Sequence, residues 1–371
     1  MAESVAGKSK YNAKLKFNGS DAFLRELRKK VDHYFESTGK KRRDCPAMYF
    51  KTATILTFFV ACYVGLLFFT HGWLLGVPLS VGLGFGLAAI GFNIQHDGGH
   101  KAYSERPWVN SLMAKTIDVI GGSSYLWDWK HNTIHHTYTN IDGHDDDIAV
   151  GPLARLTPHQ PRYWFHRAQQ IYMWALYGLL AVKWHLFDDF YCVAKGRIGG
   201  FKIKRPQGKD LVWFVAGKVI FFSLALVVPM MFHHWYNVIA CYLLAAVVSG
   251  ITMSVVFQLA HVVEEAQFPQ PVEVSPGHEK MENEWAIHQV QTTVDFARRN
   301  PVLAWLLGGL NYQVEHHLFS RICHVHYPAL SKLVEETCRE CGIQYNAHKS
   351  MISAIGSHYM QLVKMGRPTT A

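Results

Sequence analysis

The stretch TATILTFFVACYVGLLFF, residues 52–69, contains no charged side chain. It is followed by the short link THGW and then by residues 74–94, which are again uncharged. A helix needs about 20 mostly apolar residues to cross a bilayer, and few other structures satisfy the backbone hydrogen bonds there. These stretches predict a tight hairpin of two membrane-spanning helices, at about residues 52–70 and 74–94.

A second pair of apolar runs, residues 211–232 and 238–259, is separated by the short segment HHWYN. Lys218 is the only charged interruption in this pair. Its ammonium group is therefore expected to snorkel to the surface, to form an ion pair or to face a polar cavity. The sequence thus predicts an all-α membrane protein with four transmembrane helices arranged as two hairpins.

The distribution of lysine and arginine predicts the orientation of these helices. The links at residues 70–73 and 233–237 contain neither residue type. Because positive charge is enriched in cytoplasmic segments, both termini and residues 95–210 are expected in the cytoplasm, beneath a bacterial inner membrane or the endoplasmic reticulum. Aromatic-rich amphipathic stretches at residues 108–120 and 163–177 predict interfacial helices in a cytoplasmic helical cap.

The chain has 371 residues, of which 49% are hydrophobic and 18% are charged. This composition fits one membrane-anchored unit better than several soluble domains. We expect a basic cytoplasmic arm at residues 1–50, a main domain at residues 51–335 and a cytoplasmic tail at residues 336–371. An amphipathic stretch in the arm, Phe23 to Phe35, predicts a helix close to anionic lipid head groups.

The formal net charge of +9 would suit either a nucleic-acid-binding protein or the cytoplasmic face of a membrane protein. No helix-turn-helix, zinc-finger or RNA-binding signature accompanies this charge, so we expect no nucleic-acid partner. The seven cysteines are odd in number and scattered. This pattern is typical of a reducing compartment rather than of a disulfide framework.

Histidines gather where the predicted helices leave the membrane. The group HDGGH, residues 96–100, follows the second span and places two histidines at i and i+4, on one face of a helix. The group HNTIHH, residues 131–136, has histidines at i, i+4 and i+5. This spacing lets three imidazoles from one helical turn reach two neighbouring metal ions.

A third group, QVEHH, begins at Gln313, and His261 ends the fourth span at the same depth as the first group. Ionisable groups at this depth of a membrane are usually functional. All these residues belong to segments predicted to meet beneath the membrane surface. Together they give eight candidate imidazole ligands, which suit two metal ions: His96, His100, His131, His135, His136, His261, His316 and His317.

An all-imidazole ligand set argues against calcium, magnesium and a structural cysteine-zinc site. Zinc, iron and copper remain open from ligand type alone. Neutral nitrogen ligands leave room for oxygen-derived ligands on iron, so an oxygen-activating di-iron centre is the sharper hypothesis. Nearby acids are candidates to orient the imidazoles, although an exposed loop acid is the simpler interpretation of each. They are Asp97, Asp142, Asp145, Asp146, Asp147 and Glu315.

The groups HDGGH, HNTIHH and QVEHH, with two predicted spans between the second and the third, resemble those of the membrane fatty acid desaturase superfamily. The resemblance covers about residues 51–333. Glutamine at the start of the third group is similar to front-end desaturases, which insert a double bond between an existing one and the carboxyl end. The context HNTIHHTYTNIDGHDDDI is similar to bacterial linoleoyl-CoA, delta-6-like members.

The resemblance implies two iron ions that use O2 and two external electrons to convert adjacent methylenes into an alkene, with water as the other product. Zinc can replace iron in a purified sample, because imidazole sets accept both metals. The sequence lacks the His-Pro-Gly-Gly signature of the haem domain fused to many front-end relatives. A separate donor is therefore expected, either ferredoxin or cytochrome b5 with its reductase, and the basic face is a suitable dock for an acidic donor.

A fatty acyl substrate, carried as acyl-CoA or acyl-lipid, has no polar group along its chain. Selection therefore requires an apolar tunnel of defined length and bend, with polar contacts at the head group. Tyr125, Trp127 and Trp129 lie close to the second histidine group in sequence and are candidates to line this tunnel. Packing is the simpler interpretation of each.

The segment WAIHQVQTTVDF, residues 285–296, is similar to a family segment that precedes the third histidine group. His288 within it is not expected to be a ligand. Residues expected to hydrogen-bond behind the ligands are Gln289, Thr292 and Asp295 of this segment, together with Asp97 and Gln313.

Three functions are compatible with these groups to different degrees. The leading hypothesis is a front-end acyl desaturase. A sphingolipid desaturase or an acyl hydroxylase of the same superfamily would carry similar groups. A histidine-rich metal transporter belongs to a different class, but a transporter should place ligands near the middle of the bilayer, whereas these groups lie at or beyond the ends of the spans.

Overall fold

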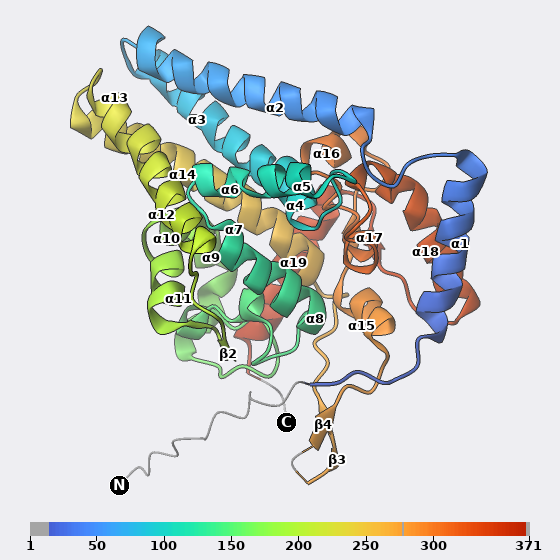
Figure 1. Cartoon of the computed structure of the whole chain (residues 1–371). Coiled ribbons are helices and arrows are strands. Elements are labelled where there is room, and N and C mark those ends of the chain that lie inside the picture. Colours follow the sequence, from blue (N-terminus) through green and yellow to red (C-terminus); the bar gives the residue numbers. More distant parts are fainter. Residues whose placement is uncertain (1–14, 277, 369–371) are drawn as a thin grey trace, which may run out of the picture.

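The computed structural model describes residues 15–276 and 278–368, and it is built almost entirely of helices (Figure 1). Residues 1–14 of the predicted arm and 369–371 of the predicted tail lie outside the described residues. The predicted all-α architecture with two hairpins is confirmed. Four helices are long and apolar enough to cross a membrane: Pro46–Phe69, Trp73–Gly99, Lys209–Met230 and Trp235–His261.

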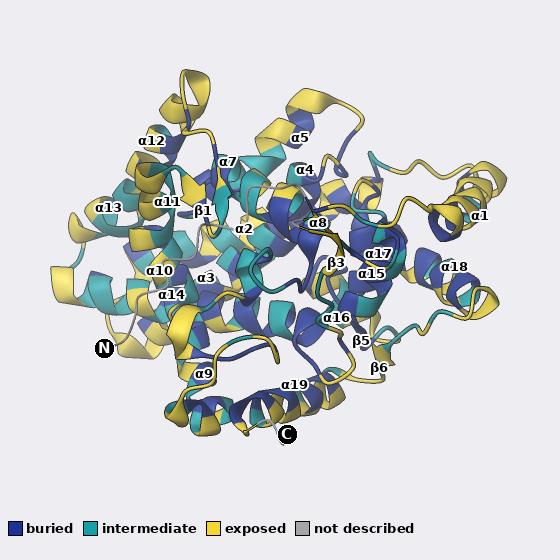
Figure 2. Ribbon diagram, turned by 90° about the horizontal axis from the view of Figure 1, so that it is seen from below, coloured by how far each residue is buried: buried dark blue, intermediate teal, exposed yellow. Residues whose placement is uncertain are grey.

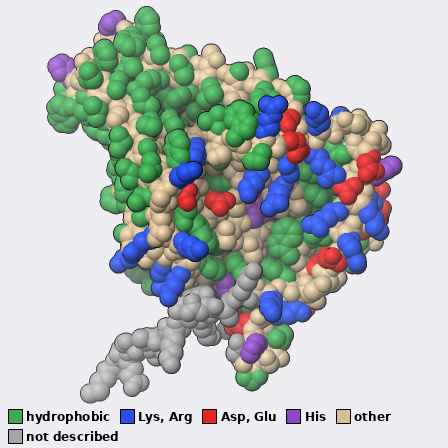
Figure 3. Space-filling view, in the orientation of Figure 1, with side chains coloured by type: hydrophobic (Ala, Val, Ile, Leu, Met, Phe, Trp, Pro, Cys, Tyr) green, Lys and Arg blue, Asp and Glu red, His purple; other side chains and the backbone are tan. Residues whose placement is uncertain are grey.

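The spans are continuous helices, and the first three of them contain a π-helical turn. They consist of α2 (Pro46–Val64) with η2 (Gly65–Phe69), α3 (Trp73–Ala89) with η3 (Ile90–Gln95) and α4 (His96–Gly99), α12 (Lys209–Phe222) with η9 (Ser223–Val227) and α13 (Val228–Met230), and α14 (Trp235–His261). The second and fourth spans therefore extend beyond the apolar runs that predicted them and reach the histidines. Figure 3 shows hydrophobic side chains covering the hairpin end of the molecule, while most charged side chains gather on the rest.

Helices α3 and α14 make the most extensive contact between any two elements. Their backbones approach closely at Gly84, where an added Cβ atom would lie 2.6 Å from the carbonyl oxygen of Ala245. Small residues at such crossings are typical of helix packing in membranes. This contact joins the two hairpins, whose second and fourth spans end at the first histidine group and at His261.

The other helices form a cap over the span ends that carry α4 and His261 (Figure 1). The cap contains α1 (Ala22–Thr38), α5 (Pro107–Ala114), α6 (Thr116–Val119), α7 (Ser124–Trp127), η4 (Asp128–His135), α8 (His136–Tyr138), η5 (Asp146–Ile148), η6 (Gly151–Leu153), η7 (Trp164–Ala168), α9 (Gln169–Gly178), α10 (Leu180–Lys183), η8 (Trp184–Asp188), α11 (Asp189–Lys195), α15 (Trp285–Thr292), α16 (Pro301–Leu306), α17 (Gln313–Leu318), η10 (His324–His326), α18 (Tyr327–Glu340) and α19 (Met351–Gly366).

Strands contribute only short pairings. They are β1 (Arg197–Ile198) with β2 (Phe201–Lys202) and β3 (Val272–Ser275) with β4 (His278–Lys280), both antiparallel, and β5 (Asp295–Phe296) with β6 (Ala347–His348), which is parallel.

The two ends of the described chain differ from the predicted arm and tail. Helix α1 has the predicted amphipathic pattern, but Leu27 and Val31 on its apolar face are buried in a cluster with residues of α18. The Nζ atom of Lys30 lies 2.6 Å from a carboxylate oxygen of Glu340 in the same contact. Protein, and not lipid, thus covers this apolar face. At the other end, α19 packs against α9 and α14 and is part of the cap.

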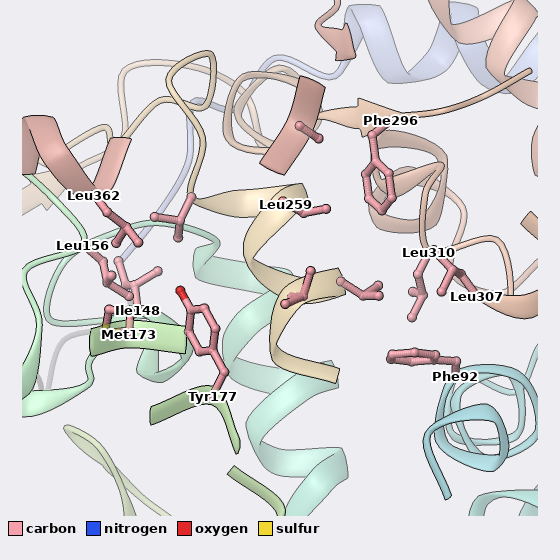
Figure 4. Packing of buried hydrophobic residues seen from close by; sticks show 14 of the residues in the cluster. Phe92, Ile148, Leu156, Met173, Tyr177, Leu259, Phe296, Leu307, Leu310 and Leu362 are labelled. Carbon is pink, nitrogen blue, oxygen red and sulfur yellow. The ribbon is translucent and has the colours of Figure 1, made fainter. Parts of the chain in front are cut away.

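The largest hydrophobic core surrounds the end of α14 (Figure 4). Leu259 is fully buried there, and the same cluster includes Tyr177 of α9, Leu362 of α19 and Phe92 of η3. Close packing leaves little freedom for the backbone in such a cluster. The core therefore fixes the position of His261, two residues beyond Leu259.

Lys218, the single charge in the predicted apolar run 211–232, forms a largely buried ion pair, one of the three outcomes expected from the sequence. Its Nζ atom donates to Oδ2 of Asp189 at 2.6 Å and to the carbonyl oxygen of Gly121 at 2.6 Å. Lys218→Met would leave Asp189 buried without its partner, which typically costs about 3–5 kcal/mol. We expect a marked fall in the thermal midpoint of the purified protein. The control is Lys183→Met, because the pair of Lys183 with Asp188 is largely exposed; equal midpoints for both variants would contradict the prediction.

Candidate metal centre

Three helix ends and one π-helical turn bring the eight predicted histidines together. His96 begins α4, His261 ends α14, and His316 and His317 lie on α17. The second histidine group lies on η4 and α8, which Figure 2 shows beside α17 in the buried centre of the cap. All eight side chains are buried, at no more than 7% exposure.

The π-helical turn η4 changes the geometry expected for the second group. An α-helix would place residues at i and i+4 on one face, whereas a π-helix brings i and i+5 into line. The Nε2 atoms of His131 and His136 accordingly lie 3.2 Å apart, and Nε2 of His131 is also 3.2 Å from Nε2 of His96. Three ring nitrogens from two distant segments thus converge on one point.

The ring nitrogens form two adjacent groups whose members lie within 4.8 Å of one another. One group consists of His96, His100, His131 and His316, and the other of His135, His261 and His317. His136 forms a third group with His316 and His317, between the other two. The arrangement provides imidazoles for two neighbouring metal ions.

Several of these nitrogens are buried and have no hydrogen-bond partner among the described residues. They are Nε2 of His100, His135, His316 and His317, and Nδ1 of His261. A buried polar atom without a partner is costly, so most buried polar atoms in proteins are paired. Metal coordination would satisfy these lone pairs. The donor set therefore fits a metal cofactor.

The opposite ring nitrogens of four of these histidines contact protein side chains, that of His261 through the Gln313 amide. Nδ1 of His135 lies 3.0 Å from Oδ2 of Asp145, and Nδ1 of His317 donates to Oε1 of Gln289 at 2.7 Å. The same Gln289 oxygen accepts from Thr139, and Nδ1 of His316 lies 3.4 Å from the Tyr327 hydroxyl. Contacts of this kind fix the tautomer and the orientation of metal-binding imidazoles.

Electrostatics keep most of this cluster neutral. Burial, followed by the neighbouring imidazoles, holds the pKa of His131, His136, His316 and His317 well below its ordinary value. Burial also opposes charge on His135, but the Asp145 carboxylate prevails and raises the pKa of His135. Neutral imidazoles are the form that binds metal ions.

The other residues expected behind the ligands lie at varying distances from them. The Gln313 amide donates to Nε2 of His261 at 2.9 Å, so Gln313 touches a predicted ligand directly. Asp97 instead contacts Nδ1 of His324 at 2.9 Å, and Asp295 accepts from the backbone N–H of Val314 at the start of α17. Thr292 bonds the backbone of its own helix. His288, not expected as a ligand, donates to the carbonyl oxygen of Thr139.

Sequence reasoning missed Asn140, Tyr327 and His324. Asn140 has a positive φ of 57°, and its amide donates to the carbonyl oxygens of His261 and Thr292. It therefore ties the second histidine group to the fourth span. Asparagine tolerates this left-handed conformation better than most residues, but its position after TYT gave no such signal in sequence.

A cavity of about 390 Å³ adjoins the histidine cluster. Trp127 lines it and has its ring 4.6 Å from that of His131. Tyr125 also lines the cavity, whereas Trp129, the third aromatic predicted for a tunnel, packs against a separate hydrophobic cluster with Ile134. Gly99 is required here, since an added Cβ would lie 2.2 Å from the Trp127 ring. The cavity lining is of mixed charge: it includes the basic residues Arg43, Lys101 and Lys115 and the acidic residues Glu105, Asp118, Asp128 and Asp210.

Comparison of the sequence with known proteins identifies the family to which the chain belongs. A family model described as "Fatty acid desaturase" matches residues 71–349. The chain is 39% identical to an sn-1 linoleoyl-lipid 6-desaturase of Arthrospira platensis, with 95% of each chain covered. It is 36% identical to a Synechocystis protein of the same name, over 95% of this chain and 98% of that one. An acyl-lipid (8-3)-desaturase of Physcomitrium patens is 34% identical over 94% of this chain and 72% of its own length. With the four apolar helices and the converging histidines, these matches establish that the chain belongs to the fatty acid desaturase family.

Proposed function

We propose that this chain is a front-end acyl-lipid desaturase, which inserts a double bond between an existing double bond and the carboxyl end of a lipid-bound fatty acyl chain. Family membership makes it an oxidoreductase that acts on fatty acyl chains. The printed names of its relatives support the finer assignment, because they include 6-desaturases and (8-3)-desaturases of acyl lipids. The observation that carries the proposal is the convergence of eight buried imidazoles beside a lined cavity.

The eight histidines would hold two iron ions, which supply O2-dependent removal of two hydrogens from adjacent methylenes when electrons are provided. In this proposal His96, His100, His131 and His316 face one ion, and His135, His261 and His317 face the other, with His136 between them. Asp145, Gln289 and Tyr327 keep the ligand nitrogens directed inward. Gln313 would hold His261 in place through a hydrogen bond and would not itself bind a metal ion.

The cavity beside Trp127 is the proposed entrance of the substrate. Although four carboxylates also line the cavity, its side chains Arg43, Lys101 and Lys115 would bind the phosphate of a lipid head group, since lysine and arginine are the usual phosphate-binding side chains. Trp127 and Tyr125 would then lie along the first part of the acyl chain. The burial of the histidines excludes bulk water from the reacting carbons, which protects reactive species from side reactions.

The remaining parts of the proposal concern the membrane and the electron donor. Both termini and the cap would face the cytoplasm, and residues 51–335 would form the desaturase domain together with the helices that complete the cap. A separate ferredoxin or cytochrome b5 would deliver the electrons, docking on the basic face of the cap.

The test is expression in an iron-replete host that supplies a suitable electron donor and lipids with oleoyl or linoleoyl chains. We expect a new double bond on the carboxyl side of the existing one, located by mass spectrometry of derivatised acyl chains. A host fed only saturated chains is the control and should give no product. A new double bond on the methyl side, or a hydroxyl group, would reject the front-end assignment. Short-pulse labelling that compares glycerolipids with acyl-CoA would identify the carrier.

A further inference from the structure

A second and larger cavity lies between the two hairpins, at the span ends remote from the histidines. Its volume is about 840 Å³, within the range of about 300–1,000 Å³ that is typical of ligand sites. All four spans line it, with apolar walls that include Leu67, Leu83, Leu224 and Met230. In Figure 1 this is the region where the hairpin tips diverge, at the upper left.

The polar lining of this cavity is concentrated at the hairpin tips. His71, His233, His234 and Asn237 belong to it, whereas none of the described lining residues is Lys, Arg, Asp or Glu. Trp73, also in the lining, is 52% exposed. Tryptophan at a hairpin tip marks the level of lipid head groups. The cavity thus combines apolar walls at the depth of acyl chains with an uncharged, hydrogen-bonding rim at the depth of head groups.

The cavity is separate from the one beside the metal centre. The two share no lining residue. The inner end of the larger cavity is closed by Ile120, His185 and Phe221. Helices α6 and α12 meet between the cavities without space for a side chain, because an added Cβ at Gly217 would lie 2.7 Å from Cβ of Asp118. A molecule in the larger cavity therefore does not reach the reacting carbons.

We propose that this cavity is a binding site for a membrane glycerolipid that is not the substrate. One acyl chain lies between the hairpins, and the head group hydrogen-bonds to the histidine rim. Besides the α3–α14 crossing at one side, the hairpins meet here through a few contacts: the Tyr63 hydroxyl donates to the carbonyl oxygen of Leu224 at 2.7 Å, His233 reaches the carbonyl oxygen of Leu67 at 2.9 Å, and the rings of Phe68 and Phe232 lie 5.1 Å apart. The bound lipid supplies packing that these contacts leave incomplete. The inference goes beyond the proposed function and does not depend on it.

The test compares two alanine-to-phenylalanine variants of the full chain. Ala225 lines the cavity, whereas Ala61 is exposed on the outer face of the first hairpin and does not. The proteins are purified in mild detergent, and retained glycerolipid per chain is measured by native mass spectrometry and by lipid extraction. We expect the unmodified chain and Ala61→Phe to retain a glycerolipid and Ala225→Phe to lose it. Cys241→Phe, which introduces a large side chain into the same cavity from the fourth span, should have the same effect as Ala225→Phe.

Each other outcome overturns the proposal. Equal lipid retention in all variants would show that the cavity does not hold a lipid. A dimer that dissociates in Ala225→Phe would identify a second copy of the chain as the occupant. Retained lipid that is desaturated when electrons are supplied would make the cavity part of the substrate path. Thermal unfolding and metal content, unchanged in the variants, exclude loss of lipid through misfolding.

Discussion

Replacing His135 with alanine is expected to abolish desaturation and to lower the metal content of the purified protein. His135 belongs to the group of three with His261 and His317, so its loss leaves two imidazoles for the second proposed ion. Metal sites with too few ligands bind weakly, and the buried nitrogens left behind have no other partner among the described residues. New double bonds in the lipids of an expressing host measure the activity, and metal analysis of the purified protein measures the content.

The matched control for this variant is His33→Ala, which removes an exposed histidine from α1. It should retain both the product and the metal content of the unmodified chain. Metal content near that of the unmodified chain in His135→Ala, with product still formed, would exclude His135 from the ligand set.

Asp145→Asn is expected to reduce desaturation by about 10- to 100-fold, the usual effect of losing a group that orients a metal ligand. The Asp145 carboxylate contacts Nδ1 of His135 and also accepts from the backbone N–H groups of Asn140 and Asp147. Asparagine keeps one oxygen and therefore only one of these two backbone bonds, and it removes the charge that raises the pKa of His135. Metal retention is therefore measured beside the rate, because it reports on the site and not on the loop alone.

Initial rates of desaturation and the loss of metal during dialysis against a chelator measure this effect. Asp142→Asn in the same loop is the control, because no hydrogen bond links Asp142 to the eight histidines among the described residues. It should behave like the unmodified chain. Similar rates for both variants would mean that Asp145 does not orient His135 for metal binding.

The spans could be predicted from the sequence because apolar length alone determines whether a helix crosses a bilayer. The surroundings of other helices depend on contacts that are distant in sequence. The amphipathic pattern of α1 predicts an apolar face, but a lipid surface and the side of α18 are equally apolar partners. The π-helical turn η4 likewise could not be predicted from the sequence, since the spacing of HNTIHH is also compatible with an α-helix.

The eight histidines could be proposed because their spacing and depth are properties of single helices. The acids that orient these imidazoles could not be predicted in the same way, because their positions depend on the geometry of loops. Of the five aspartates proposed from the sequence, Asp97 and Asp145 are both buried against an imidazole, but only Asp145 contacts one of the eight predicted ligands from a buried position, after the turn at Asn140. Trp129 differs from Trp127 for a similar reason, because two positions along a helix turn a side chain to another face.

Lys101 in the cavity lining follows directly after His100, so its ammonium group and the first histidine group belong to one continuous segment of the chain. A head group bound by Lys101 would therefore stand at a constant distance from the oxidised bond. The distance between the bound head group and the metal centre would then set the position of the new double bond, counted from the ester carbon, whatever the length of the chain toward the methyl end. Lengthening the acyl chain by two carbons should then leave the position of the new double bond, counted from the carboxyl group, unchanged.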